Sequence, residues 1–205
     1  MPKGDDPSVA IVLLAAGASR RMEGRDKLME EVAGQPLLRR SAQVALGTGC
    51  PVIVTLPPNG ARAAALEGLA VQQVPVEEAQ DGLSASIRAG LRARPAGSDA
   101  VLIVPADLPE ITPAHYTRCL DAVATDPRRI YRLCDAAGRA GHPVAFPSDL
   151  FADLMALRGD SGARALIERE AARLTTLPCT DDGPTLDLDT PDDWAAYRRR
   201  RGESS

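Results

Sequence analysis

The stretch VAIVLLAAGASRRM, residues 9 to 22, joins an unbroken apolar run to a loop of small residues. Val9–Leu14 is aliphatic at successive positions, which is typical of a strand that is covered on both faces. Strands of this kind belong to mainly parallel sheets, and such sheets bind ligands beyond the carboxyl ends of their strands. The stretch therefore predicts an α/β fold with a ligand site at the loop that begins at Ala15.

The rest of the chain continues the alternation of short apolar runs and helical stretches, without an internal repeat. We expect strands at Val9–Leu14, Val52–Leu56, Val71–Val74, Ala100–Val104, Ile130–Cys134 and Val144–Phe146. We expect helices at Pro36–Leu46, Ala61–Leu66, Leu83–Arg94, Pro113–Ala124, Asp149–Leu157, Ser161–Glu170 and Asp192–Arg200. Thr112 and Thr190 each precede a proline and are expected to cap a helix. The pattern predicts a three-layer α/β/α, Rossmann-like fold with a mainly parallel sheet.

The composition fits one domain with an aliphatic core. The chain has 205 residues, of which 44% are hydrophobic and only 3% aromatic, so Ala, Leu and Val must fill the core. We expect a single domain over residues 1–205, with disordered tails at 1–7 and 202–205. A net charge of −4 and the scarcity of aromatic residues argue against nucleic-acid binding, which takes a basic surface and base-stacking side chains.

The N-terminal apolar run is too short to span a membrane or to form the core of a signal peptide. The run Val9–Ala16 falls well below the ~20 residues that a membrane-spanning helix needs, and Asp5 and Asp6 precede it where a signal peptide is basic. The four cysteines form no CxxC pair, which favours buried or free thiols over a disulfide framework or a zinc site. We therefore expect a cytoplasmic protein without a membrane partner.

The loop after the first strand has the composition of a phosphate-binding loop. Ala15, Ala16 and Gly17 let a ligand approach the backbone closely, so that successive N–H groups can cradle phosphate oxygens. Arg21 and Lys27 add positive charge, Arg21 as a planar fork and Lys27 as a point charge. The loop has neither the glycine spacing of the dinucleotide fingerprint nor a Gly-Lys-Ser/Thr triplet. The alternative is a plain strand-to-loop transition with solvated basic side chains.

Asp107 follows a second apolar strand and is expected at the same edge of the sheet. It comes after Val101–Pro105, and the carboxyl ends of parallel strands face one cleft. Mg²⁺ is typically held by one or two carboxylates together with waters and substrate phosphates, which makes Asp107 a candidate ligand. An ordinary Asp-Leu-Pro turn is the alternative.

Two further stretches are candidates for substrate contacts. Gly82–Gly90 opens a helix whose first amides can face an anion, and Ser84 and Ser86 can donate hydrogen bonds, unless Ser84 only caps the helix. His142, in a Gly-His-Pro triplet, can bind phosphate or orient a second substrate, although a structural histidine is the alternative. His115 has no motif around it and is expected on a helix surface.

Taken together, these stretches resemble the signature of nucleotidyltransferases of the MobA/MocA type. The resemblance rests, in chain order, on Leu14–Met22, Lys27-Leu28, Gly34–Leu38, Gly82–Gly90, Pro105–Pro109, Gly141–Pro143, Gly159–Arg164 and Asp187–Pro191. The joint order and spacing of these motifs are far more specific than any one of them. Within the superfamily the chain is most similar to molybdenum cofactor cytidylyltransferases, because of Ala-Ala-Gly instead of Ala-Gly-Gly, the Gly82–Gly90 segment and Gly-His-Pro.

The resemblance implies the nucleotide-diphospho-sugar transferase fold and a reaction. The reaction is the Mg²⁺-dependent transfer of CMP from CTP to molybdenum-loaded molybdopterin, with release of pyrophosphate and a molybdenum hydroxylase as a possible recipient of the product. Arg21, Lys27 and Asp107 are the implied catalytic set. The implied nucleotide-binding residues are Leu14, Ala15, Ala16, Gly17, Ser19, Arg21, Lys27, Gly82, Ser84 and Ser86.

The same resemblance extends to the metal and the second substrate. It places an acidic ligand just before Thr-Pro, which is Asp189 here, so that Asp107 and Asp189 are the expected pair, unless Asp189 merely precedes a helix cap. Asp187 shares that face if the segment is extended. Asp187, His142 and Asp160 are expected on the side of the second substrate, unless Asp160 only caps the helix that follows it.

One residue departs from the family pattern, and two other readings stay open. Glu23 stands where family members often have glycine, and its carboxylate is expected to point outward or to pair with an arginine. The chain could instead use GTP or another nucleoside triphosphate, or a sugar or polyol phosphate as acceptor. It could also be a non-catalytic chaperone of the molybdenum cofactor.

Overall fold

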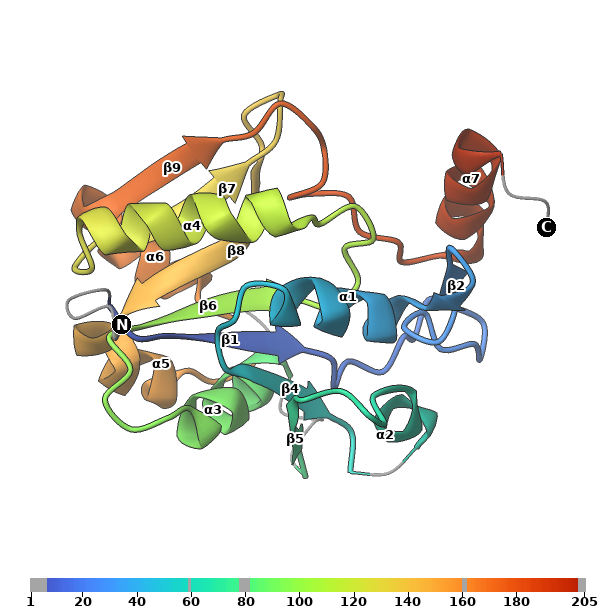
Figure 1. Cartoon of the computed structure of the whole chain (residues 1–205), viewed down its shortest axis with the longest axis horizontal. Helices are drawn as coiled ribbons and strands as arrows, with labels where there is room; N and C mark the ends of the chain where they lie inside the picture. Colours follow the sequence, from blue (N-terminus) through green and yellow to red (C-terminus); the bar gives the residue numbers. More distant parts are fainter. Residues whose placement is uncertain (1–6, 59, 78–81, 160–161, 203–205) are drawn as a thin grey trace.

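A seven-stranded sheet forms the centre of the chain in a computed structural model that describes residues 7–58, 60–77, 82–159 and 162–202 (Figure 1). The strand order is β5-β4-β1-β6-β8-β7-β9. The bounds are β1 Val9–Leu14, β4 Val52–Leu56, β5 Gln72–Pro75, β6 Ala100–Pro105, β7 Ile130–Cys134, β8 Ala140–Pro147 and β9 Leu174–Pro178. Neighbouring strands are parallel except at β8, which runs antiparallel to β6 and β7, so the expected mainly parallel sheet is confirmed.

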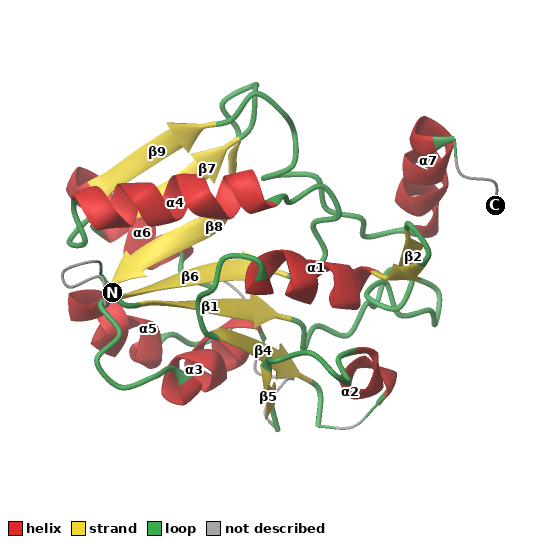
Figure 2. Cartoon of the chain, in the orientation of Figure 1, coloured by secondary structure: helices red, strands yellow, loops and turns green. Residues whose placement is uncertain are grey.

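Helices cover both faces of this sheet (Figure 2). The helices are α1 Leu37–Leu46, α2 Ala61–Ala65, α3 Leu83–Ala93, α4 Pro113–Thr125, α5 Phe151–Ala156, α6 Arg164–Arg169 and α7 Pro191–Arg201. Residues of α1, α4 and α7 share one apolar core, and residues of α3, α5 and α6 share another on the opposite face. Strand β1 serves both cores, because Ile11 and Leu13 point into the first whereas Val12 and Leu14 point into the second. This alternation confirms the predicted three-layer architecture.

Most boundaries lie within two residues of the sequence prediction, but β8 begins at Ala140 instead of Val144, and α6 begins at Arg164 instead of Ser161, which lies outside the described residues. Three further differences concern the kind or the presence of an element. The helix expected from Asp149 begins with a 3₁₀ turn, Ser148–Leu150, and becomes α-helical only at Phe151. The last strand, β9, was missed, because LTTLP is half polar and half exposed at the edge of the sheet. A two-stranded hairpin of β2 (Glu31–Val32) and β3 (Gln35–Pro36) was also missed, since two-residue strands leave no periodicity to read.

The ends of β1 and β6 place two predicted motifs side by side. The two strands pair in parallel until Leu14 stands opposite Pro105, so the loop at Ala15 and the turn at Asp107 leave the sheet at the same edge. Helix α3 lies close beneath β1, because a Cβ on Gly90 would come within 2.3 Å of Val12 Cγ1. The glycine is therefore needed for this approach.

Several smaller expectations can be compared with the structure. All four cysteines are free thiols, as expected. His115 is buried, not on a helix surface, because its ring contacts Thr112 and the carboxylate of Asp181. Of the expected tails, residues 1–6 and 203–205 lie outside the described part, whereas Gly202 ends α7 in a left-handed conformation. Among the described residues, no helix has the length and apolar character needed to cross a membrane.

Candidate active site

A cavity of about 620 Å³ opens at the carboxyl ends of β1 and β6. Its walls come from the loop after β1, the start of α3, the end of β6 and the segment before α7. The lining residues are Leu14, Ala15, Ala16, Gly17, Ala18, Ser19, Arg20, Arg21, Lys27, Leu28, Gly82, Leu83, Ser86, Pro105, Asp107 and Asp189. The volume is in the range of cavities that hold small molecules.

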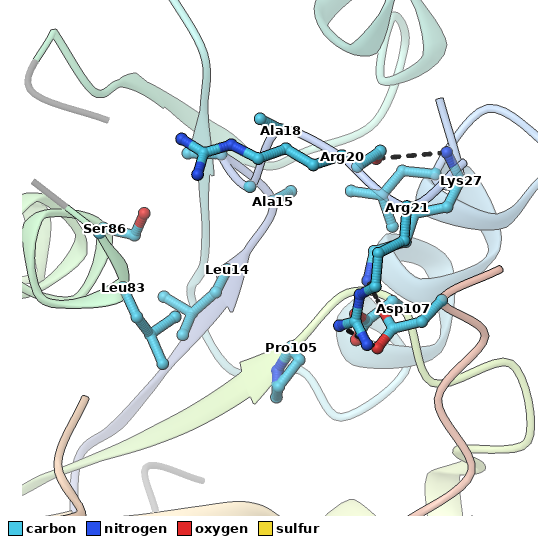
Figure 3. A pocket seen from close by; sticks show the side chains of 16 residues that line it. Leu14, Ala15, Ala18, Arg20, Arg21, Lys27, Leu83, Ser86, Pro105 and Asp107 are labelled. Carbon is cyan, nitrogen blue, oxygen red and sulfur yellow. Dashed lines mark hydrogen bonds and ion pairs between the residues drawn. The ribbon is translucent and has the colours of Figure 1, made fainter. Parts of the chain in front are cut away.

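A lysine between two aspartates forms the charged end of this cavity. Figure 3 shows Lys27, Arg21 and Asp107 on the same side of the cavity. Lys27 Nζ lies 2.5 Å from Asp107 Oδ2 and 2.7 Å from Asp189 Oδ1. Arg21, largely exposed, pairs with the other oxygen of Asp189. Burial lowers the pKa of Lys27, but the charges and hydrogen bonds of Asp107 and Asp189 outweigh this effect, and the net pKa is raised. The lysine is therefore a cation at neutral pH.

The neighbouring elements fix the two carboxylates from different sides. The amide of Ala106 donates to Leu14 O (3.1 Å), and Ser41 Oγ of α1 donates to Ala106 O (2.9 Å), which holds the turn before Asp107. The amides of Asp189 and Thr190 donate to Asp193 Oδ2 at 3.2 and 2.9 Å. Thr190 Oγ1 accepts from the Asp193 amide at 3.2 Å, so the predicted helix cap is present and orients Asp189 as well.

The carboxylates fit a divalent cation. Asp107 Oδ1 is buried and has no hydrogen-bond partner among the described residues, so this oxygen is available to a ligand. Burial raises the pKa of Asp187, and the nearby charges of Asp189 and Asp107 raise it further, so three acidic groups converge here. The geometry of the described residues does not by itself close a site of three protein ligands. Two carboxylates completed by substrate phosphates and water form the arrangement that Mg²⁺ prefers.

The opposite wall of the cavity is apolar. Leu83 is the one large hydrophobic side chain among the described residues that is exposed, at 41%, and it lies near Leu14 and Pro105 (Figure 3). Ser86 adds a hydroxyl from the same helix. A cavity with one charged end and one apolar wall can hold an anionic molecule that carries a flat ring.

The loop after β1 leaves room for such a molecule. A Cβ on Gly17 would meet no protein atom within 4 Å, so the glycine faces open space. Ser19 adopts a left-handed conformation with φ +49, and Glu23 another with φ +52. Glu23 is exposed, as expected for a carboxylate that points outward.

The cavity brings together most of the residues that the sequence singled out. Leu14, Ala15, Ala16, Gly17, Ser19, Arg21, Lys27, Gly82, Ser86, Asp107 and Asp189 all line it. Ser84 does not line it: this serine lies inside α3, fully buried, and accepts a hydrogen bond from Arg88 Nη1 (3.1 Å), while Gly82 occupies the cap position. The idea that Ser84 caps the helix was therefore wrong. Asp160 lies outside the described residues.

His142 lies close enough to Asp107 to feel its charge, but it does not line the cavity. Its amide donates to Pro184 O (2.9 Å), its Nδ1 lies 3.4 Å from Ile103 O, and the peptide bond to Pro143 is cis. Burial lowers the pKa of His142, and the charge of Asp107 only partly offsets this effect. The imidazole is therefore neutral at pH 7, which makes it a poor partner for a phosphate and a better hydrogen-bonding neighbour.

Two charged residues under the loop, Arg62 and Asp26, were not predicted from the sequence. Arg62 of α2 is 5% exposed and donates to both oxygens of Asp26. An arginine within an alanine-rich stretch gives no sign of burial in the sequence, and the acceptor lies 36 positions away. Arg20 and Leu83 also line the cavity without having been singled out.

Comparison with protein families gives one match that spans most of the chain. Residues 11–174 match the MobA-like NTP transferase domain. The curated relatives include the purine catabolism protein PucB of Bacillus subtilis, 27% identical over 94% of this chain and 97% of the relative. Nicotine blue oxidoreductase of Paenarthrobacter nicotinovorans is 29% identical (91% and 94%), and a molybdenum cofactor guanylyltransferase of Rhodopseudomonas palustris is 33% identical (97% and 97%).

Solved structures show the same fold. A homologue of Rv0371c from Mycobacterium sp. strain JC1 superposes with a TM-score of 0.81 at 29% identity, covering 94% of this chain and 96% of the other. Rv0371c of Mycobacterium tuberculosis in complex with manganese gives 0.74 at 27% identity (92% and 97%). A 4-diphosphocytidyl-2C-methyl-D-erythritol synthase of Anaerococcus prevotii gives 0.78 at 13% identity (97% and 98%), a likeness of fold alone.

Proposed function

The chain belongs to the family of MobA-like NTP transferase domains, and we propose that it transfers CMP from CTP to the terminal phosphate of molybdenum-loaded molybdopterin. Family membership makes it a nucleotidyltransferase, whereas the base and the acceptor are the proposal. The observation that carries it is the cluster of Lys27, Asp107 and Asp189 at the charged end of the cavity. One relative is named as an oxidoreductase, so the cluster, which suits phosphate and metal chemistry, is what favours nucleotidyl transfer.

The reaction needs charge neutralisation and alignment more than covalent help. In the proposed transfer, an oxygen of the acceptor phosphate attacks the α-phosphorus of CTP. The bond from that phosphorus to the bridging oxygen breaks, and pyrophosphate leaves with the electron pair. A divalent cation, Mg²⁺ in this proposal, held by Asp107 and Asp189, would supply positive charge at the phosphates.

The side chains of this chain then have separate tasks. Amides of the loop around Gly17 would face the phosphates, and Arg21 and Lys27 would offset the charge that grows on the leaving pyrophosphate. Leu14, Leu83 and Pro105 offer the apolar wall against which a base can lie. Asp187 and His142, beside the carboxylates but outside the cavity lining, are proposed on the side of the acceptor.

CTP is proposed instead of GTP because of the sequence features on which the family resemblance rests. Ala15-Ala16-Gly17 replaces an Ala-Gly-Gly triplet, and the Gly82–Gly90 segment and the Gly-His-Pro triplet accompany it. Ala16 lines the cavity, and its methyl group takes up space that a glycine at this position would leave free. That difference suits the smaller pyrimidine ring.

The direct test is pyrophosphate release from CTP in the presence of Mg²⁺ and molybdenum-loaded molybdopterin. Asp107→Asn is expected to reduce turnover by about 10²-fold or more, since it removes charge where the phosphates are neutralised. Asp121→Asn, on the exposed face of α4 and outside the cavity lining, is the matched control and should keep wild-type turnover. Normal turnover by Asp107→Asn would contradict the proposal.

A nucleotide panel separates the alternatives. Melting temperatures with Mg²⁺ and CTP, GTP, ATP or UTP should rise most with CTP, because a ligand of the native state stabilises it by mass action. A larger shift with GTP would assign another base to the same chemistry. Stabilisation by CTP and pterin without pyrophosphate release would favour a non-catalytic chaperone, and turnover only with a sugar or polyol phosphate would change the acceptor.

A further inference from the structure

A buried arginine outside every sequence motif lies beneath the loop that lines the cavity. Arg62 belongs to the short helix α2, which follows β4, and only 5% of its surface is exposed. It does not line the cavity, and its guanidinium hydrogen-bonds to the loop instead. Resting on the proposed function, we propose that Arg62 is a positioning residue that holds the loop from Ala15 to Lys27 in the conformation that receives the triphosphate.

Each nitrogen of the guanidinium is used. Nε donates to Asp26 Oδ2 and Nη2 to Asp26 Oδ1, both at 2.7 Å, which is the two-pronged pairing that arginine forms with a carboxylate. Nη1 donates to Ala15 O at 2.6 Å, where the chain leaves β1. One side chain therefore ties the first residue of the loop to a residue near its end.

Ser19 connects the middle of the loop to the same arginine. Its Oγ accepts from Arg62 Nη2 at 3.2 Å and from the amide of Lys27 at 3.3 Å. It also donates to Asp26 Oδ1 at 3.4 Å. Ser19 has φ +49, a conformation that side chains other than glycine seldom adopt, and these hydrogen bonds hold it there.

The same network reaches Lys27, the residue between the two carboxylates. Asp26 Oδ1 accepts from the amide of Leu28 at 3.0 Å, on one side of Lys27, and Ser19 accepts from the amide of Lys27 itself. The backbone of Lys27 is thus fixed through Asp26 and Ser19. Its side chain can then reach Asp107 and Asp189.

The charges in the network depend on one another. Burial raises the pKa of Asp26, but the hydrogen bonds and charge of Arg62 outweigh it, and the net pKa is lowered. Asp26 is therefore an anion that matches the buried cation. Removal of either partner leaves an unpaired charge under the loop, and the loop is expected to open so that water reaches that charge.

The arrangement offers a matched control on a neighbouring helix. Arg39 of α1 donates from Nη1 to Ala65 O at 2.9 Å and to Glu67 O at 3.0 Å, so it binds the end of the helix that carries Arg62. Within the described part of the chain, Arg39 has no hydrogen bond to the loop. Arg39→Lys therefore disturbs the support of α2 and spares the network, whereas Arg62→Lys keeps the charge and loses the fork.

The experiment combines amide hydrogen exchange with nucleotide binding, both measured well below the melting temperature. In Arg62→Lys, exchange at Lys27 and Leu28 should accelerate at least about tenfold, because their acceptors are released. The amides of Ala15 and Ala106, which bond to Thr55 O and Leu14 O, should exchange as in the wild type. The dissociation constant for Mg·CTP should rise about tenfold, while that for CMP should change less than about threefold.

Asp26→Asn carries the test if Arg62→Lys does not fold, because it keeps the shape of the side chain and removes its charge. Unchanged exchange at Lys27 and Leu28 in Arg62→Lys, or equal effects in Arg39→Lys, would overturn the proposal, because Arg62 would then serve only the packing of its helix. Faster exchange with unchanged Mg·CTP binding would overturn the positioning role. If the wild type binds none of CTP, GTP, ATP or UTP, the proposed function fails, and the exchange data alone decide whether Arg62 orders the loop.

Discussion

Lys27 Nζ lies 2.5 Å from Asp107 Oδ2, although the two residues are 80 positions apart in the chain. The lysine that is proposed to face the leaving pyrophosphate and the aspartate that is proposed to hold a metal ion neutralise each other here. A bound triphosphate with its cation would give both residues new partners. The ammonium of Lys27 occupies the carboxylate oxygens that a cation would need, so we expect the pairing to oppose metal binding without a nucleotide.

Lys27→Met is expected to affect metal binding and catalysis in opposite directions. Without the ammonium, Asp107 and Asp189 attract a cation more strongly, so the affinity for Mn²⁺ alone should rise about fivefold, or about 1 kcal/mol. Nucleotidyl transfer should fall about 10²-fold, because positive charge at the leaving group is lost. Mn²⁺ titration followed by electron paramagnetic resonance measures the first effect and pyrophosphate release the second.

Lys27→Arg is the control for this pair of effects. It keeps a cation between the carboxylates and should leave the affinity for Mn²⁺ near the wild-type value. Weaker Mn²⁺ binding in Lys27→Met than in the wild type would contradict the expected competition between Lys27 and the metal ion, since the lysine would then support the metal site.

Gly17→Ala tests whether the space above the loop belongs to a ligand. An added Cβ meets no protein atom within 4 Å, so the melting temperature should stay within about 2 °C of the wild type. The methyl group enters the cavity, and displacement of a phosphate by about 1 Å should weaken Mg·CTP binding at least about tenfold. Thermal melts and calorimetric titration check the two statements.

A second glycine gives the contrasting result. In Gly90→Ala the new Cβ would lie 2.3 Å from Val12 Cγ1, so this variant should lose about 1–3 kcal/mol of folding free energy through overpacking between α3 and β1. A destabilised Gly17→Ala, or one with wild-type affinity for Mg·CTP, would mean that the loop does not face the ligand.

Elements buried on both faces of the sheet could be predicted from the sequence, because burial leaves a signal there. The aliphatic run Val9–Leu14 predicts β1 correctly, since every position is inside one of two cores. The edge strand β9 gives no such signal, because its threonines and its partly exposed leucines look like loop residues. Edge strands are specified by their neighbours more than by their own residues.

In the candidate site, too, some residues could be predicted from the sequence and others could not. Lys27, Asp107 and Asp189 were expected together, because Lys27 belongs to the loop after β1, Asp107 follows β6, and the family resemblance adds Asp189 just before a helix cap. Arg62 was not expected, because its role arises from Ala15 and Asp26, which lie 47 and 36 positions away. Contacts of that kind depend on how α2 packs against α1 and the loop after β1, which no local pattern encodes.

Glu23→Gly should stabilise the protein. Glu23 has φ +52, and a left-handed conformation costs a residue with a side chain about 1–2 kcal/mol, whereas glycine gives back about 0.5–1 kcal/mol through the entropy of the unfolded chain. The net gain should be about 0.5–1 kcal/mol in urea denaturation. Ala33→Gly, at φ +53, should also gain stability.

Glu31→Gly is the counterpart at an exposed strand position without positive φ, and it should lose stability. Destabilisation by Glu23→Gly would show that the glutamate side chain makes a contact that outweighs its backbone conformation. Because the loop also faces the proposed triphosphate, the loss of one negative charge should leave Mg·CTP binding equal or tighter.

Asp135→Asn should remove part of the acid sensitivity of the fold. Asp135 is buried at the end of β7, where its carboxylate accepts from Thr185 Oγ1 (2.7 Å) and from Arg139 Nε (2.6 Å). Burial raises its pKa, but hydrogen bonds from Thr185 and Arg139 outweigh this effect and lower the pKa from 3.8 to about 2. The carboxylate thereby joins the turn after β7 to the segment that leads to Asp189.

The sign of the pH effect follows from that lowered value. As the pH falls, the carboxyl of Asp135 takes up a proton near pH 3.8 in the unfolded chain but only at about pH 2 in the native state. The contribution of Asp135 to the free energy of unfolding is therefore complete above pH 3.8 and is lost as the pH falls to about 2. Asp135→Asn should therefore be less stable at neutral pH and lose less stability between these two pH values. Urea denaturation over a pH series measures both, with Asp121→Asn on the exposed face of α4 as control. If the free energy of unfolding of Asp135→Asn falls with decreasing pH as steeply as that of the wild type, other carboxylates cause the acid sensitivity.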